Sequence, residues 1–131
     1  MWLVLPKANS FLSIVDASDA PGTLLVRARR EGDIEAVFPD AKVVKSVGRD
    51  YLYRAGVTRA DVAAALTAQV MDLDYPNAKA ASDDPGFHAA MADTWQTFAE
   101  LQEYYPYKAK PRAVYPKPVR RLKSPKGWDK V

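Results

Sequence analysis

The clearest strand signal in the chain is Thr23-Leu-Leu-Val-Arg-Ala-Arg29, where apolar and charged residues alternate. Side chains of a β-strand point to opposite faces in turn, so Leu24 and Val26 share one face, and Arg27 and Arg29 share the other. This period predicts a strand with one buried and one polar face.

Further strands are predicted on both sides of this one. Phe11-Leu-Ser-Ile-Val15 reads as a strand, and the polar loop 16–22 joins it to residues 23–29 as a hairpin. Residues 41–47 and 51–57 enclose a glycine-containing turn and predict a second hairpin. Tyr51, Tyr53, Ala55 and Val57 are expected to alternate onto one face of that hairpin.

Three helices are predicted between and after the strands. Residues 33–38 form a short one with Asp33 as its cap, and residues 58–73 form a second one that begins with a capping-box-like pattern. The last helix begins at Asp84-Pro85, an N-cap followed by proline at the first helical position. Its apolar side is formed by Phe87, Met91, Trp95, Phe98, Leu101 and Tyr105.

The resulting order, ββαββαα, predicts an α+β protein. We expect a four-stranded antiparallel or mixed sheet in the order 11–15, 23–29, 51–57, 41–47, a permuted ferredoxin-like arrangement with the helices on one face. An open antiparallel meander with helices packed on it is the alternative. Residues 1–107 would form one domain, followed by a basic, proline-rich tail over residues 108–131.

Charge is divided sharply between these two parts. Residues 108–131 hold nine Lys or Arg and one acid, a net charge of +8, whereas residues 1–107 hold ten basic and fifteen acidic residues, a net charge of −5. An acidic body with a basic tail is typical of a protein that docks on nucleic acid or on an acidic protein surface.

The tail carries the main candidate contact residues. Its prolines favour an extended chain, and aromatic side chains lie between the charged ones. Such residues can anchor the tail on an acidic protein, or they can stack on bases and contact phosphates. The candidates are Arg112, Tyr115, Lys117, Arg120, Arg121, Lys123 and Trp128. Contact between the tail of one copy and the acidic body of another would give a homo-oligomer. A solvated, disordered tail is the competing interpretation.

A second candidate patch lies on the predicted sheet. Arg27 and Arg29 share a strand face, and Arg54 would lie on the neighbouring strand. If that face is open, the three guanidinium groups could bind phosphate or carboxylate. Charges scattered over a solvated sheet face are the simpler alternative.

Signals for catalysis, cofactors and metals are missing from the sequence. There is no cysteine, the glycines form no phosphate-binding fingerprint, and His88 with Asp84 gives only two neighbouring metal ligands. We therefore expect no enzyme activity, no cofactor and no metal. The apolar start, Met1 to Leu5, is too short for a signal peptide or a membrane span and predicts a first strand. We expect a cytoplasmic protein that does not bind membranes.

One family resemblance can be stated. The stretches Leu24–Arg29, Gly32–Pro39, Asp50–Arg54, Val62–Leu66 and Leu73–Lys79 look like a family of small α+β proteins encoded in bacterial genomes and by phages. The resemblance covers roughly residues 10 to 103 and implies a compact α+β domain with a mobile-element origin. It implies no activity, because the family has none assigned.

Together these patterns favour a non-catalytic protein-binding module, a small inhibitor or adaptor acting on a host or defence protein. It would use its acidic body and its basic aromatic tail as contact surfaces. A nucleic-acid-binding protein that docks through the tail is the alternative.

Overall fold

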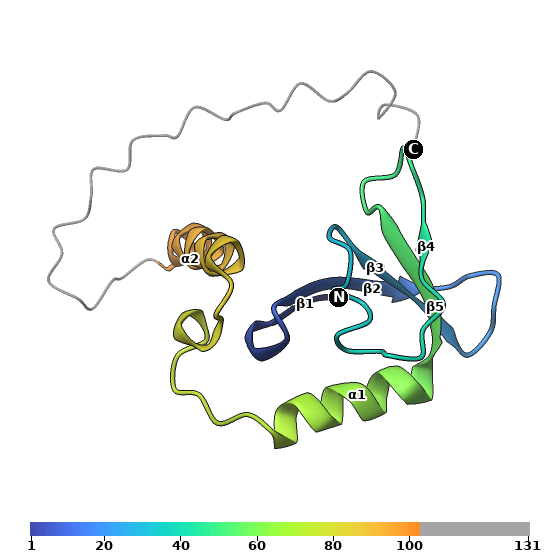
Figure 1. The fold of residues 1–131 in the computed structure, drawn as a ribbon, viewed down its shortest axis with the longest axis horizontal. Helices are drawn as coiled ribbons and strands as arrows, with labels where there is room; N and C mark the ends of the chain where they lie inside the picture. Colours follow the sequence, from blue (N-terminus) through green and yellow to red (C-terminus); the bar gives the residue numbers. More distant parts are fainter. Residues whose placement is uncertain (103–131) are drawn as a thin grey trace, which may run out of the picture. The chain divides into compact units, whose positions relative to one another are not determined.

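The computed structural model describes residues 1–102, and the chain divides into two units, residues 1–97 and residues 98–131. In the first unit, five strands form one open antiparallel sheet in the order β1-β2-β3-β5-β4 (Figure 1). The strands are β1 (Trp2–Leu5), β2 (Ser10–Asp16), β3 (Thr23–Ala28), β4 (Val44–Lys45) and β5 (Tyr53–Thr58). The helices are α1 (Arg59–Met71) and α2 (Pro85–Ala99), and 3₁₀ turns lie at Pro6–Ala8 and Lys79–Ala81.

The α+β class is confirmed, and the four predicted strands occur in the predicted order. The strand count of four is wrong, because the N-terminal strand also joins the sheet. The amine of Met1 donates to the carbonyl of Ile14 at 2.8 Å, and the amide of Ile14 donates back to the carbonyl of Met1 at 2.8 Å. The sheet is therefore closer to the open antiparallel alternative than to a ferredoxin-like one.

The core lies on one face of the sheet, as the alternation in residues 23–29 predicts. Its centre is the cross-strand row Ile14, Val26 and Ala55, all nearly inaccessible to solvent. Val62 of α1 covers this row, and each fully buried side chain of this size contributes about 1.5–3 kcal/mol. The other members of the core are Leu12, Leu24, Ala28, Ile34, Phe38 and Val57.

The predicted short helix at residues 33–38 is wrong. Residues 31–37 form hydrogen-bonded turns without a regular helix, so the crossover helix of a ferredoxin-like fold is missing from this connection. Asp33 does not cap a helix. Its Oδ2 accepts a hydrogen bond of 3.3 Å from the amide of Phe11 at the start of β2, and its side chain is buried. A contact across 22 residues of sequence has replaced the local cap.

Helix α1 begins as predicted, and its apolar side is less buried than expected. Thr58 is the N-cap, and its Oγ1 accepts a 3.1 Å hydrogen bond from the amide of Asp61. Val62 is buried, whereas Val70 is 68% exposed, and Leu73, beyond the end of the helix at Met71, is 54% exposed. Among the described residues, no helix is long and apolar enough to cross a membrane.

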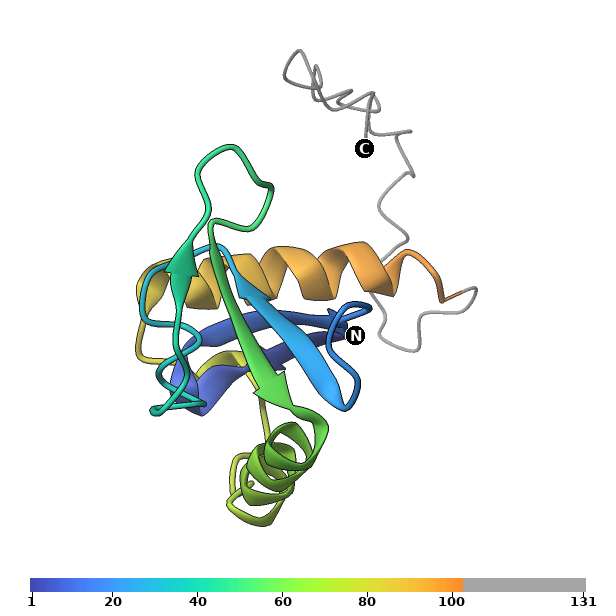
Figure 2. The same ribbon diagram turned by 90° about the vertical axis from the view of Figure 1, so that its right-hand side faces the viewer.

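The two helices lie on opposite faces of the sheet, so the prediction of helices on one face is wrong (Figure 1, Figure 2). Helix α1 packs on β3 and β5, whereas Met91 and Trp95 of α2 border Val4, which points away from α1. On the predicted apolar side of α2, Phe87 and Met91 are buried. Trp95 and Phe98 on the same side are 49% and 60% exposed, and Leu101, which is 77% exposed, lies beyond the end of α2 at Ala99. Tyr105 lies outside the described residues.

One side chain, Arg30, joins three separate parts of the first unit. Its Nη2 donates to the carbonyl of Asn9 at 2.8 Å, and its Nη1 donates to Oδ2 of Asp84 at 2.9 Å. Its Nε lies 3.5 Å from Oδ1 of Asp33. The guanidinium also lies 5.5 Å from the ring centroid of Phe87. Arg30 therefore ties the β1–β2 turn, the segment after β3 and the start of α2 together.

Replacing Arg30 by alanine should lower the free energy of unfolding by about 1–2 kcal/mol, because charge-assisted hydrogen bonds are lost and buried Asp33 loses its cation. Urea unfolding of the full chain measures this. The matched control is Arg59→Ala, which removes only an exposed ion pair with Asp16 at 3.6 Å and should change stability by less than about 0.5 kcal/mol. Equal losses in the two variants would contradict the linking role of Arg30.

The two carboxylates bound by Arg30 should respond to pH with opposite signs. Burial raises the pKa of Asp33 above its usual 3.8, whereas the amide of Phe87 and then Arg30 lower the pKa of Asp84. The contribution of Asp84 is therefore present above pH 3.8 and is lost as the pH falls through its lower folded pKa. The contribution of Asp33 is fully present below pH 3.8 and is lost as the pH rises through its higher folded pKa.

Unfolding of Asp84→Asn and Asp33→Asn across the acid range measures these contributions. As the pH is lowered, the free energy of unfolding of the wild type should lose its advantage over that of Asp84→Asn. Over the same range, the free energy of unfolding of the wild type should rise relative to that of Asp33→Asn. Two differences that move in the same direction would contradict this assignment.

Candidate functional site

The three arginines of the predicted sheet patch do lie together. Arg27 of β3 pairs directly with Arg54 of β5, and Arg29 follows the end of β3. The pairing extends across the sheet, from Trp2 through Ser13 to Arg27 and from Arg54 to Val44. Directly paired residues place their side chains on the same face. This row therefore runs across all five strands on the face opposite the core.

Tyr51 organises the arginine cluster, the name used here for Arg27, Arg29 and Arg54. The guanidinium carbon of Arg27 lies 4.7 Å from the Tyr51 ring centroid, and that of Arg29 lies 4.5 Å from it. Tyr51 as a whole is only 4% exposed, so these cation–π contacts are largely shielded from water. Such contacts contribute about 0.5–2 kcal/mol and hold the guanidinium groups in place.

Hydrogen bonds hold the same groups from other sides. Nη2 of Arg27 donates to Oγ of Ser13 at 2.7 Å, and Nη1 of Arg29 donates to the carbonyl of Asp50 at 3.1 Å. Nε of Arg54 donates to the carbonyl of Tyr51 at 3.3 Å, and its Nη2 lies 3.4 Å from Oδ1 of Asp50. The cluster is therefore positioned before any partner binds.

Like charges are crowded in this cluster. Burial, followed by the positive charges of Arg49 and Arg27, lowers the pKa of Arg54, and Asp50 opposes that shift. Nε of Arg27 is buried and has no hydrogen-bond partner among the described residues. An acidic group brought to this surface would relieve the repulsion and find donors already in position.

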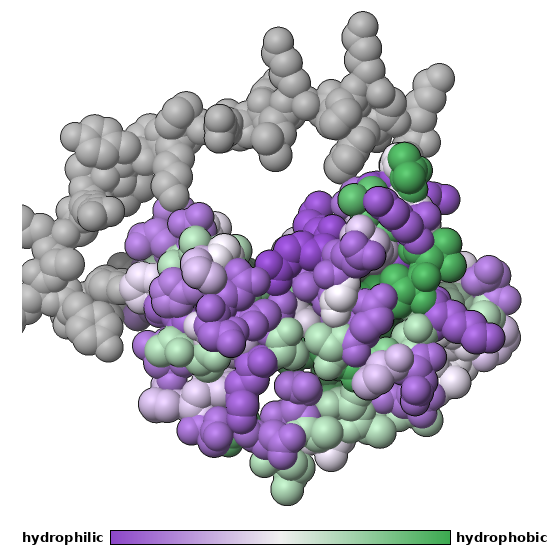
Figure 3. All heavy atoms as spheres, in the orientation of Figure 1, coloured by the Kyte–Doolittle hydropathy of each residue, from purple (hydrophilic) through white to green (hydrophobic). Residues whose placement is uncertain are grey.

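Exposed apolar residues border the arginine cluster. Val44 of β4 pairs with Arg54 of β5 and is 62% exposed. Val47, in the turn that follows β4, is 85% exposed. Figure 3 shows hydrophobic residues gathered along β4 and at the tip of the β4–β5 hairpin, bordered by hydrophilic residues. The surface thus combines oriented cations with an apolar rim.

Sequence reasoning found the arginines and missed the residues around them. Tyr51 was expected to share a face with Tyr53, but it precedes β5 and its ring contacts Arg27 on the opposite face. Asp50, Val44 and Val47 belong to no recognisable sequence motif. The feature that could have identified Asp50 and Tyr51 is their position just before the hairpin strand that carries Arg54.

The predicted contact residues of the tail, from Arg112 to Trp128, all lie outside residues 1–102. The structure therefore describes the sheet patch and not the tail.

The weak metal candidate is explained by ordinary structural contacts. The two candidate ligands are His88 and Asp84. Nδ1 of His88 donates a hydrogen bond of 2.6 Å to the carbonyl of Lys79, and Oδ1 of Asp84 accepts a hydrogen bond of 3.0 Å from the amide of Phe87. Within residues 1–102, no group of three or more His, Cys, Asp or Glu side chains could hold a metal ion.

Comparison of the chain with known protein families, curated proteins and solved structures finds no match. The family resemblance inferred from the sequence stays a prediction, and the candidate site rests on its geometry.

Proposed function

We propose that the chain is a small non-catalytic protein-binding module, an inhibitor or adaptor, and that the arginine cluster with Val44 and Val47 contacts an acidic surface on its partner. The partner would place carboxylates on Arg29 and Arg54 and apolar side chains on the two valines.

The observation that carries this proposal is the fixed position of three like-charged groups around one residue, Tyr51. Burial, followed by the neighbouring cations Arg49 and Arg27, lowers the pKa of Arg54, so the arrangement has an electrostatic cost in the free protein. The guanidinium groups are already ordered by Tyr51, Asp50 and Ser13, so a partner would lose little side-chain entropy on binding them.

The chemistry of the surface favours a protein over a nucleic acid. Arginine and tyrosine are enriched at protein interfaces, and the exposed valines fit an apolar partner surface. Affinity for nucleic acid comes mainly from many phosphate contacts, whereas this cluster offers three cations. The basic tail would add a second contact with the same acidic partner, or would bind nucleic acid if the alternative function holds.

The proposal is tested by comparing the full-length protein with two variants as immobilised bait. Arg29→Gln/Arg54→Gln removes two cations from the cluster, and Arg59→Gln removes one cation from the exposed start of α1. Wild type and Arg59→Gln should retain the same acidic protein from a lysate. The double variant should bind that purified protein at least about tenfold more weakly, a loss of about 1.4 kcal/mol, by titration calorimetry.

Parallel salt titrations with mixed DNA and RNA oligonucleotides distinguish the alternative. Steeply salt-dependent oligonucleotide binding, with no protein whose retention depends on the cluster, would contradict the proposal and favour a nucleic-acid-binding protein.

A further inference from the structure

Strand β1 is an edge strand with one side open. Met1 and Ile14 form a pair that exchanges two backbone hydrogen bonds. Because such pairs alternate along an antiparallel ladder, the backbone amides and carbonyls of Leu3 and Leu5 also point towards β2. The amides and carbonyls of Trp2 and Val4 then point outward. Within residues 1–102, no hydrogen-bond partner of these outward groups is found.

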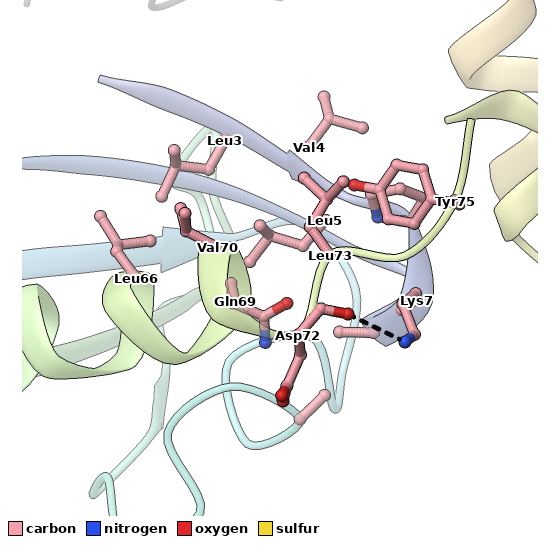
Figure 4. A pocket seen from close by; sticks show the side chains of 13 residues that line it. Leu3, Val4, Leu5, Lys7, Leu66, Gln69, Val70, Asp72, Leu73 and Tyr75 are labelled. Carbon is pink, nitrogen blue, oxygen red and sulfur yellow. Dashed lines mark hydrogen bonds between the residues drawn. The ribbon is translucent and has the colours of Figure 1, made fainter. Parts of the chain in front are cut away.

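An apolar groove lies on each side of this edge. The first, of about 510 Å³, runs between β1 and α1, with Leu3, Val70 and Leu73 gathered in it (Figure 4). The second, of about 360 Å³, includes Trp95 of α2 in its wall. Val4 borders both grooves.

Both lysines that line these grooves already have partners among the described residues. Nζ of Lys7 donates to the carbonyl of Asp72 at 3.3 Å and to Oδ1 of Asp74 at 3.1 Å. Nζ of Lys79 lies 4.3 Å from the ring centroid of Trp95. A strand added to β1 points its side chains alternately into the two grooves, so uncharged apolar residues fit best.

Strand β1 itself has that composition, Trp2-Leu-Val-Leu5. We propose that two copies of the chain pair through their β1 edges, antiparallel and related by a twofold axis at Leu3. The outward amide and carbonyl of Trp2 then exchange hydrogen bonds with those of Val4 in the second copy. By symmetry, Val4 of the first copy forms the same pair with Trp2 of the second. The two five-stranded sheets become one continuous sheet.

Exposure and edge protection support this pairing. Trp2 is 70% and Val4 42% exposed, and Val4 lines the first groove together with exposed Val70 and Leu73. Proteins usually protect edge strands with charges, proline or very short length. The other edge, β4, has two residues, one of them Lys45, whereas β1 has four uncharged residues and no proline. An unprotected edge of this kind is expected where it is used for pairing.

The test is sedimentation of the full chain over a range of concentrations up to about 0.1 mM, where an interface with a micromolar Kd is populated. The wild type should be a dimer. Val4→Pro removes the outward N–H while leaving the bonds between β1 and β2, and it should be monomeric. Val4→Ala, which keeps the N–H, should remain largely dimeric.

A second variant guards against misfolding of β1. Leu73→Glu places a charge in the first groove from an exposed position, and it should weaken the dimer at least about tenfold without changing the circular dichroism spectrum. A wild type that is monomeric throughout would overturn the proposal and leave the edge to a strand of a different protein. A dimer that survives Val4→Pro and dissociates in high salt would overturn it in favour of contacts between the tail and the acidic body. None of these three variants alters the arginine cluster, so the proposed function can fail or hold independently.

Discussion

The guanidinium of Arg30 is the constraint on which much of the described structure depends. It sits where the β1–β2 turn, the segment after β3 and the N-terminus of α2 meet, and it hydrogen-bonds the backbone of the first and a carboxylate of the last. Helix α2 has few buried residues with which to hold its place, only Phe87 and Met91. Its attachment therefore relies on this polar junction, where Asn9 adds a 2.6 Å hydrogen bond to Oδ1 of Asp83 and a further bond with Ser82.

That junction determines which surfaces stay open. Helix α1 lies over the core face, and α2 is attached near β1 and β2. Among residues 1–97, no helix or strand covers the arginine cluster on the opposite face or the outer edge of β1. One surface is cationic with an apolar rim, and the other is an apolar edge with Lys7 bound to Asp74 near one end. Their different chemistry fits the two contacts that we propose, one with an acidic partner and one with a second copy.

Sequence reasoning succeeded where a local period decides the outcome. The alternation in residues 23–29 identified β3, its buried face and the shared face of Arg27 and Arg29, because all three follow from strand geometry. It failed where a distant contact decides. Asp33 has the residue type of a helix cap, yet it bonds to Phe11, and the helix does not form. The apolar period predicted helix α2, although the helix ends at Ala99, before Leu101. A period also cannot tell which turns another element will cover, and Trp95 is left half exposed. Tyr51 was missed because it lies just outside the strand whose alternation was used to place it.

The central claim is that the arginine cluster is ordered before any partner binds. Nitrogen-15 NMR of the arginine Nε–H groups in the free full-length protein tests it most directly. The Nε–H of Arg27, buried and held over Tyr51, should give a resolved resonance with slow solvent exchange, and Arg54 should behave similarly through its bond to the Tyr51 carbonyl. Exposed Arg59 is the internal reference for rapid exchange. Resonances of Arg27 and Arg54 that coincide with that of Arg59 and exchange as fast would contradict the claim, because the guanidinium groups would then be free in solution.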